Sequence, residues 1–357
     1  MSQLKTIRSL KKRTNILVIV FMFLFAQNAF SAGPSGKDGF DAGQMILHHI
    51  YDSHEWHVFD WKGKSYSIPL PIIIFHEERG FDIFMSSKFN HGKSIHNNYM
   101  LDHGKIVFVG DDGEIDKPQT SMIWDFSITK NVFSLLFSIF ILLSVFITIS
   151  RRYKNKKNKA PKGIQSFLEP IIIFVRDDIA KSAIGEKHYE KYLNFLLTVF
   201  FFIFLNNLLG LVPFFPGGAN LTGNIAVPMV LASLVFIITT LSGTKYYWKH
   251  IFAMPGVPKP VLLILTPIEI IGVLLKPLVL MIRLFANITA GHIIILSFFS
   301  MIFIFGEMHP AAGYGVSVFS GLFVLFMMTL ELLVAFLQAY VFTLLAAMYF
   351  GAALEEH

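Results

Sequence analysis

Two apolar segments in the C-terminal part of the chain are too long to cross a membrane upright. They cover about residues 261–304 and 315–353, and a helix of roughly 40 residues is about 60 Å long. The hydrocarbon core of a bilayer is only about 30 Å thick. We therefore predict two steeply tilted or bent helices, with Pro267 and Pro277 as positions where the first can bend.

Three shorter apolar segments are predicted to cross the membrane as well. They cover residues 132–149, 192–212 and 225–241. Hydrophobic residues make up 54% of the 357-residue chain and charged residues only 15%, whereas a soluble domain is about one quarter charged. We predict an all-α integral membrane protein with about five membrane helices. Residues 164–178 mix apolar and charged side chains, which favours an amphipathic helix at the membrane interface.

The loops differ in their positive charge, and this difference predicts the orientation of the chain. Lys and Arg cluster directly after the first span, at residues 151–159, and again at 245–250. The loops at 213–224 and 306–315 contain neither residue. By the positive-inside rule, we expect the two basic segments, 151–159 and 245–250, and the C-terminus to be cytoplasmic. We expect a bacterial inner (plasma) membrane protein, and we interpret the net charge of +6 as membrane anchoring rather than nucleic-acid binding.

The N-terminal third of the chain has a different composition. Residues 1–31 have a basic start, a short apolar core and the small-x-small sequence Ala29-Phe30-Ser31, which predicts a cleaved signal peptide. An uncleaved anchor helix is the alternative. Residues 32–127 are predicted to form a small, partly β, extracytoplasmic segment, and residues 128–357 the membrane domain. The expected strands of the extracytoplasmic segment are residues 66–75, 81–84 and 105–109.

Eight of the 13 histidines lie in this N-terminal segment. The spacing of the first acidic and histidine side chains could supply metal ligands. These residues are His48, His49, Asp52, His54 and His57. The later sequence His76-Glu77-Glu78-Arg79-Gly80 does not match the H-E-x-x-H zinc motif, and the chain has no cysteine. We favour a solvated, titrating surface and expect no metal and no cofactor.

The first long apolar segment contains three charged residues at intervals of seven. Glu269, Lys276 and Arg283 fall on one stripe, because seven residues are nearly two helical turns, and Asn287 extends that stripe. A charged side chain inside a membrane costs about 3 kcal/mol and usually marks a functional site. For Glu269 and Lys276 a structural role as ion pair or interfacial side chain is the alternative.

Three further polar residues lie in the long segments. His292 is nine residues beyond Arg283 and therefore points to the opposite face of the helix. Glu331 and Gln338 are seven residues apart on the second long segment, again on one stripe. Since arginine does not lose its proton in proteins, Arg283 can attract a carboxylate and block a proton but cannot relay one.

The sequence around Arg283 resembles the signature of subunit a of F-type ATP synthases, which reads roughly R-L-x-x-N-x-x-A-G. Arg283 corresponds to the essential arginine of this motif and Asn287 to its asparagine. The segment Phe204–Pro213 resembles the family's N-x-x-G-L-x-P turn. Leu337–Phe342 resembles its L-Q-A-x-x-F segment and places Gln338 on a functional glutamine. The resemblance extends over about residues 125–357.

The resemblance implies a proton-conducting stator subunit, with the ATP chemistry on other subunits. Two half-channels and the arginine would couple proton flow to rotation of a ring of c subunits, and peripheral-stalk b subunits, other parts of the complex and lipid are the further expected partners. Some members carry an acid at the position of His292 and a histidine at that of Glu331, which suggests that both residues share one access path. The candidate residues for proton translocation are Arg283, His292, Glu331, Gln338, Asn287, Glu269 and Lys276.

Two other functional classes are open to the sequence. A secondary transporter could bind a small anion at Arg283, but it predicts inverted repeats that the chain does not show. A membrane-anchored metalloenzyme could use the histidine-rich segment, and it predicts metal bound to the N-terminal part.

Overall fold

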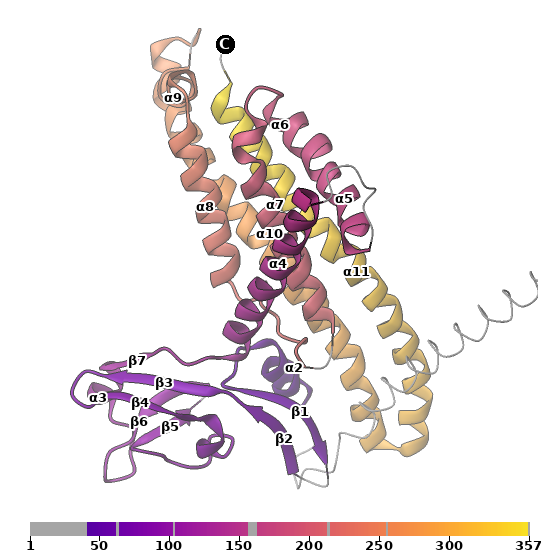
Figure 1. The fold of residues 1–357 in the computed structure, drawn as a ribbon. Coiled ribbons are helices and arrows are strands. Elements are labelled where there is room, and N and C mark those ends of the chain that lie inside the picture. Colours follow the sequence, from indigo (N-terminus) through magenta and orange to yellow (C-terminus); the bar gives the residue numbers. More distant parts are fainter. Residues whose placement is uncertain are drawn as a thin grey trace, which may run out of the picture. The chain divides into compact units, whose positions relative to one another are not determined.

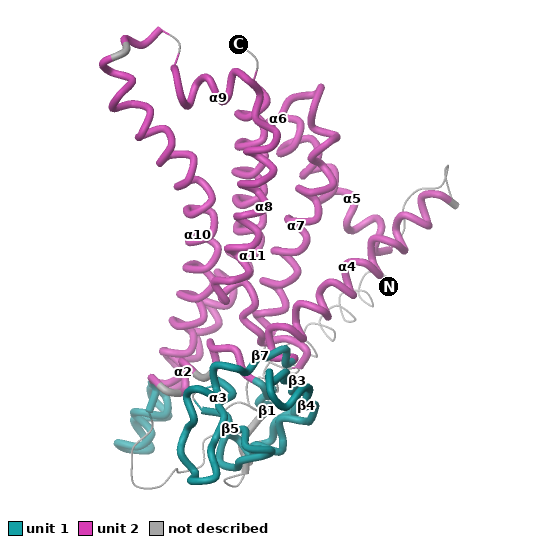
Figure 2. Tube along the Cα trace, turned by 90° about the vertical axis from the view of Figure 1, so that its left-hand side faces the viewer, with its two compact units in different colours: residues 1–42, 54–127, 301–316 teal, residues 43–53, 128–300, 317–357 magenta. Residues whose placement is uncertain are grey.

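The computed structural model describes residues 41–61, 64–102, 104–155, 163–212, 215–254 and 256–355. The predicted signal peptide at 1–31 and residues 156–159 of the basic segment after the first span lie outside these residues. The chain divides into two compact units, coloured separately in Figure 2. Of the described residues, unit 1 contains 41–42, His54–Ser127 and Met301–Val316, and unit 2 contains the remainder.

Short helices and strands make up the N-terminal part, and long helices follow (Figure 1). The N-terminal elements are α2 (Ala42–Ile50), β1 (Glu55–Trp61), β2 (Lys64–Pro69), β3 (Pro71–His76), β4 (Gly80–Met85), η1 (Ser86–Phe89), β5 (Tyr99–Asp102), β6 (Lys105–Phe108), α3 (Lys117–Ser121) and β7 (Ile123–Asp125). The later elements are α4 (Lys130–Asn155), α5 (Ile164–Phe174), the π-helix η2 (Val175–Lys181), α6 (Ser182–Ile184), α7 (Tyr189–Leu211), α8 (Ala226–Ser242), α9 (Lys245–Phe252), α10 (Lys259–Met308) and α11 (Pro310–Leu354).

The strands of unit 1 form three small antiparallel sheets. Their strand orders are β1-β2, β4-β3-β7 and β5-β6. One face of the three-stranded sheet supplies Ile72 and Ile74 to a core that also contains Phe89, Tyr99 and Ile106. The prediction of a small β-containing segment beside a largely helical membrane protein is therefore confirmed.

The single strand predicted for residues 66–75 is two strands in two different sheets. β2 ends at Pro69 and β3 begins at Pro71, and proline has no N–H to donate to a sheet. Leu70 between them bonds to Ser86 instead: its N–H donates to the Ser86 hydroxyl and its carbonyl accepts from the Ser86 N–H. The sheet pairing therefore breaks at this residue.

Four helices of the described chain are long and apolar enough to cross a membrane, or five spans if the bent pair α8 and α9 counts as one. The four are α4, α7, α10 and α11, and the axes of α8 and α9 meet at 103°. The predicted amphipathic segment at 164–178 is helical and continues as η2 and α6 to Ile184. The chain is therefore a multi-pass membrane protein, with about the number of spans that was predicted.

The two long helices are longer than the sequence predicts. α10 has 50 residues and continues through Pro267 and Pro277, and α11 has 45 residues. The prediction of a loop at 306–315 is wrong, because only His309 separates the two helices. Glycines make this tight connection possible: a Cβ at Gly313 would lie 2.7 Å from the Cα of Gly306.

The core of unit 2 lies between α7 and α11, with contributions from η2, α8 and α10. Bulky side chains of α7 such as Phe200 meet small residues of α11 such as Ala339 and Ala346, all completely buried. From α10 only Leu280 and Leu284 reach this cluster as buried residues. Much of the surface of α10 and α11 is therefore not covered by other described residues of the chain.

Candidate functional site

Arg283 lies at the middle of α10, on a side of the helix that the described chain leaves open. Leu280 and Leu284 are each only 1% exposed, whereas Arg283 and Asn287 are exposed. A residue in a helix is turned by about 100° from the next. The packing of the two leucines into the core therefore fixes the guanidinium of Arg283 outside it.

Within the part of the chain that the structure describes, Arg283 makes no hydrogen bond and no ion pair. Its electrostatic neighbour is Tyr349 near the end of α11. The ammonium of Lys276 lies over the same ring, 5.5 Å from its centroid, which is a cation–π contact. Tyr349 therefore joins two members of the predicted stripe, whereas Glu269 forms no ion pair with Lys276.

Gly291 brings α10 against α11 at the level of Glu331. A Cβ at Gly291 would overlap the Glu331 carboxylate, so the absence of a side chain makes room for this acid. Glu331 is only 9% exposed, and its Oε2 has no hydrogen-bond partner among the described residues. The sequence alone gives no hint that the glycine and the acid touch.

His292, the next residue of α10, faces α7. A Cβ at Gly210 would lie 3.7 Å from His292 Nε2 and 3.5 Å from the carbonyl oxygen of Ala219. At two consecutive residues α10 thus meets two different helices: Gly291 lies against the Glu331 carboxylate of α11, and the imidazole of His292 lies near Gly210 of α7. The predicted pair His292 and Glu331 is brought to one level of the helix, while Arg283 occupies another face.

Buried polar side chains from α7 and the loop after it continue this polar region. Asn207 donates from Nδ2 to the Ala335 carbonyl at 3.3 Å, and its Oδ1 accepts from the Thr222 hydroxyl at 2.8 Å. Ala335 lies between Glu331 and the buried Gln338 on α11. The contacts with Asn207 therefore tie α7 to the polar stripe of α11.

Several buried polar atoms of this region have no protein partner within the described residues. They are Asn206 Oδ1, Asn220 Nδ2, Thr289 Oγ1 and Glu331 Oε2. In folded proteins such atoms are usually satisfied by ordered water. An otherwise apolar helical unit thus contains a set of polar groups suited to hold water or to pass protons.

A family model for the ATP synthase A chain matches residues 132–351. The chain belongs to this family. Subunit a of ATP synthase from Chlorobium phaeobacteroides strain DSM 266 is 45% identical over 243 residues, covering 66% of this chain and 68% of that protein. The protein of the same name from strain BS1 is 44% identical over 334 residues, covering 91% and 80%. Subunit a from Chloroherpeton thalassium is 42% identical, covering 66% and 69%.

The membership explains why the α10 and α11 motifs occur together. The homologues are named ATP synthase subunit a, and together with the apolar helices this assigns the chain to ATP synthesis, proton transport and the membrane. A second family model, a domain of unknown function (DUF8433), matches residues 45–126. The function of this N-terminal part is therefore not given by the ATP synthase family model.

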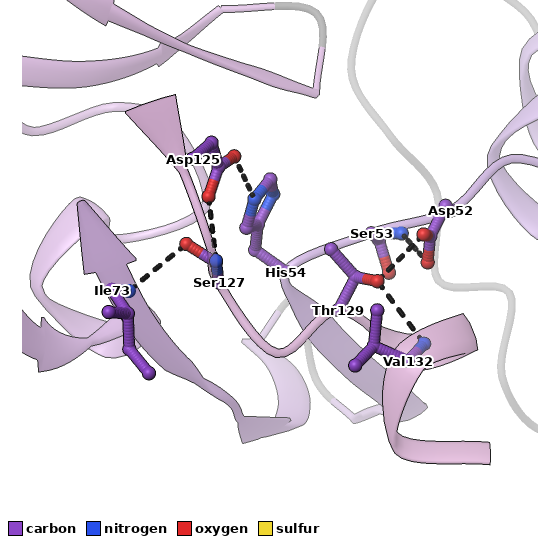
Figure 3. Close-up of polar contacts among 8 residues, drawn as sticks. All are labelled: Asp52, Ser53, His54, Ile73, Asp125, Ser127, Thr129 and Val132. Carbon is purple, nitrogen blue, oxygen red and sulfur yellow. Dashed lines mark hydrogen bonds and ion pairs between the residues drawn. The ribbon is translucent and has the colours of Figure 1, made fainter. Parts of the chain in front are cut away.

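Two of the five residues weighed as metal ligands, Asp52 and His54, form local hydrogen bonds with other partners (Figure 3). His54 Nε2 lies 3.2 Å from Asp125 Oδ2. Burial would raise the pKa of Asp125, but its bonds with His54 and Ser127 hold the pKa below the ordinary value. Among the described residues no group of three His, Cys, Asp or Glu side chains could hold a metal ion.

Asp52 has a structural task that the sequence did not reveal. Its Oδ1 accepts from the Asn131 N–H at 3.0 Å, and its Oδ2 accepts from the Thr129 hydroxyl at 2.7 Å. The ammonium of Lys130 donates to the carbonyls of His49 and Tyr51. Asp52 therefore satisfies one of the free N–H groups at the start of α4, that of Asn131, as a helix cap does.

Proposed function

We propose that this chain is the proton-conducting stator subunit of an ATP synthase complex, with a rotating ring of c subunits and the peripheral-stalk b subunits as its partners. Arg283 is the observation that carries this proposal. A permanent charge in the middle of a long apolar helix is costly in a membrane, and it makes no ion pair within the described residues. We infer that a carboxylate from another subunit faces it.

The role of Arg283 follows from its permanent charge. At 4 Å and an effective dielectric constant near 20, the attraction between a guanidinium and a carboxylate is about 4 kcal/mol. The arginine therefore favours the ionised form of a ring carboxylate that passes in front of it. Because the arginine cannot hand on a proton, it also separates the two sides of the path. Desolvation must offset part of the attraction, or the ring would not turn.

We assign the two half-channels to the polar residues on either side of Arg283. His292, Glu331 and Gln338, together with the buried asparagines of α7, belong to the external half, which supplies a proton to the ring. Glu269 and Lys276, nearer the start of α10, belong to the cytoplasmic half, where the proton leaves. A potential of 100 mV contributes about 2.3 kcal/mol per charge moved. The chain itself then needs neither a cofactor nor a nucleotide site.

Cross-linking tests whether the ring passes in front of Arg283. Val279 lies one turn before Arg283 and is 44% exposed, whereas the adjacent Leu280 is 1% exposed. We expect a photo-cross-linker on Val279→Cys, in the assembled complex, to attach to a small membrane protein with a buried carboxylate. The same group on Leu280→Cys should attach only within the chain. The proposal is wrong if Val279→Cys reaches no other subunit.

We further propose that the complex lies in the bacterial inner membrane with the C-terminus of this chain in the cytoplasm. The chain has no native cysteine, so single cysteines can be labelled cleanly. We expect a membrane-impermeant maleimide to label Tyr314→Cys but not Lys154→Cys when applied from outside the inner membrane. Labelling of Lys154→Cys alone would reverse the orientation.

A further inference from the structure

The outer face of the three-stranded sheet of unit 1 is apolar along all three strands, and the carboxylate of Glu77 lies at its edge beside Trp124. In its antiparallel register, Phe75 of β3 pairs with Phe81 of β4 and with Trp124 of β7, and Ile73 pairs with Ile83. The Phe126 N–H donates to the Ile73 carbonyl, which extends the pairing beyond β7. Alternate residues of a strand share a face. The residues of this face, called the apolar sheet face below, are Pro71, Ile73, Phe75, Phe81, Ile83, Met85, Trp124 and Phe126.

The apolar sheet face is exposed although the domain already has a core. Phe81, Ile83 and Trp124 are 67%, 70% and 57% exposed, while Ile72 and Ile74 of the same sheet are completely buried on its other face. β3 is thus apolar on both sides, as is typical of strands covered on both faces. A contiguous exposed patch of this kind marks an interaction surface.

The connection to α4 limits what can cover this face. Phe126 precedes Lys130, the first residue of a membrane-spanning helix, by only four residues. A fully extended chain gains at most about 3.5 Å per residue, so this edge of the sheet lies within roughly 14 Å of the start of α4. Beyond each side of the hydrocarbon core lies a headgroup region several Å thick. The edge of the sheet is therefore held at the membrane surface.

The composition of the face suits that location. Trp124 keeps its ring exposed while its indole N–H donates to Glu77 Oε1 at 3.2 Å. An aromatic side chain with one apolar and one polar end is typical of the membrane–water interface. The phenylalanine, isoleucine and methionine side chains of the face carry no charge and can enter the upper acyl region, while the Glu77 carboxylate beside Trp124 stays at the headgroup level.

We propose that the apolar sheet face lies on the lipid surface of the leaflet in which α4 begins. The domain of unknown function would then be a membrane-surface domain that rests on lipid beside the first span. This inference requires that α4 crosses the membrane, and it does not depend on the proposed proton path.

Lipid-dependent quenching tests the proposal in the assembled complex in liposomes. A polarity-sensitive fluorophore is attached to Ile83→Cys in the middle of β4 and, separately, to Met85→Cys at the end of the same strand. Lys105→Cys on β6 is the matched control, because Lys105 is exposed but belongs to a different sheet. The quenchers are lipids with a nitroxide in the upper acyl chain and iodide in the water.

We expect both labels on the face to shift their emission to the blue, to be quenched by the nitroxide lipid and to lose quenching by iodide. The label on Lys105→Cys should show the reverse. Iodide quenching of the face equal to that of the control overturns the proposal, because the face is then open to water. Protection from both quenchers also overturns it, because a protein partner then covers the face.

Discussion

The Arg283→Ala variant is expected to insert and assemble normally but to lose proton-driven ATP synthesis. The guanidinium makes no hydrogen bond or ion pair within the described residues, and the neighbouring Leu280 and Leu284 already hold α10 in the core. Alanine is a good helix former and is less costly in a bilayer than arginine. The folded chain therefore loses little when this side chain is removed.

The loss of activity follows from the size of the missing attraction. An interaction of about 4 kcal/mol corresponds to roughly a thousandfold in rate. Arg283→Lys keeps a charge but not the planar fork that matches a carboxylate, so we expect its coupling to fail as well. ATP synthesis and passive proton permeability are measured in vesicles, with assembly followed in parallel. A raised passive permeability of the alanine variant would agree with a lost barrier between the half-channels.

A matched control removes a different cation. Lys249 on α9 is exposed and lies off the stripe, so Lys249→Ala should retain synthesis. Near-normal synthesis by assembled Arg283→Ala complexes would show that the deepest charge of α10 is structural and that the proposed mechanism is wrong.

The membrane helices could be predicted because hydropathy and helix length are properties of contiguous sequence. The stripe through Arg283 could be predicted for the same reason, since a spacing of seven fixes a face of any helix. What hydropathy did not show is where α10 ends. The glycine, proline and histidine residues of the segment 306–315 predict a loop. The structure has two helices there instead, and the glycines Gly306 and Gly313 allow these helices to approach closely.

The parts of the site that were missed depend on contacts between distant residues. Tyr349 meets Lys276 across two helices, and Asn207 meets Thr222 and Ala335. Asp52 was considered as a metal ligand, but it caps α4 from a position 79 residues earlier in the chain than Asn131. No spacing rule predicts such pairs. The doubled asparagine in the apolar sequence of α7 was the one signal that could have indicated a buried polar contact.

The second large effect is expected at Glu331. Its carboxylate is buried against Gly291, the residue before His292, so removal of either polar side chain should interrupt proton delivery at one level of α10. We expect Glu331→Ala and His292→Ala each to lower proton flow severely without preventing assembly. Glu186→Ala is the matched control, because this carboxylate is exposed in the turn before α7. Full activity of the His292→Ala, Glu331→Ala double variant would contradict the assignment.

Two further variants separate the position of the carboxylate from its mere presence. The exchange His292→Glu with Glu331→His should restore part of the proton flow that either single exchange loses, since both groups then remain in the path.

Gly291→Ala should lower proton flow because its methyl group displaces the Glu331 carboxylate, whereas Gly272→Ala on the same helix meets no atom within 4 Å. Both glycine changes favour the helix by up to about 1 kcal/mol, so helix stability cannot explain a difference between them. Equal activity of the two glycine variants would show that the contact between α10 and α11 at Glu331 does not limit proton flow.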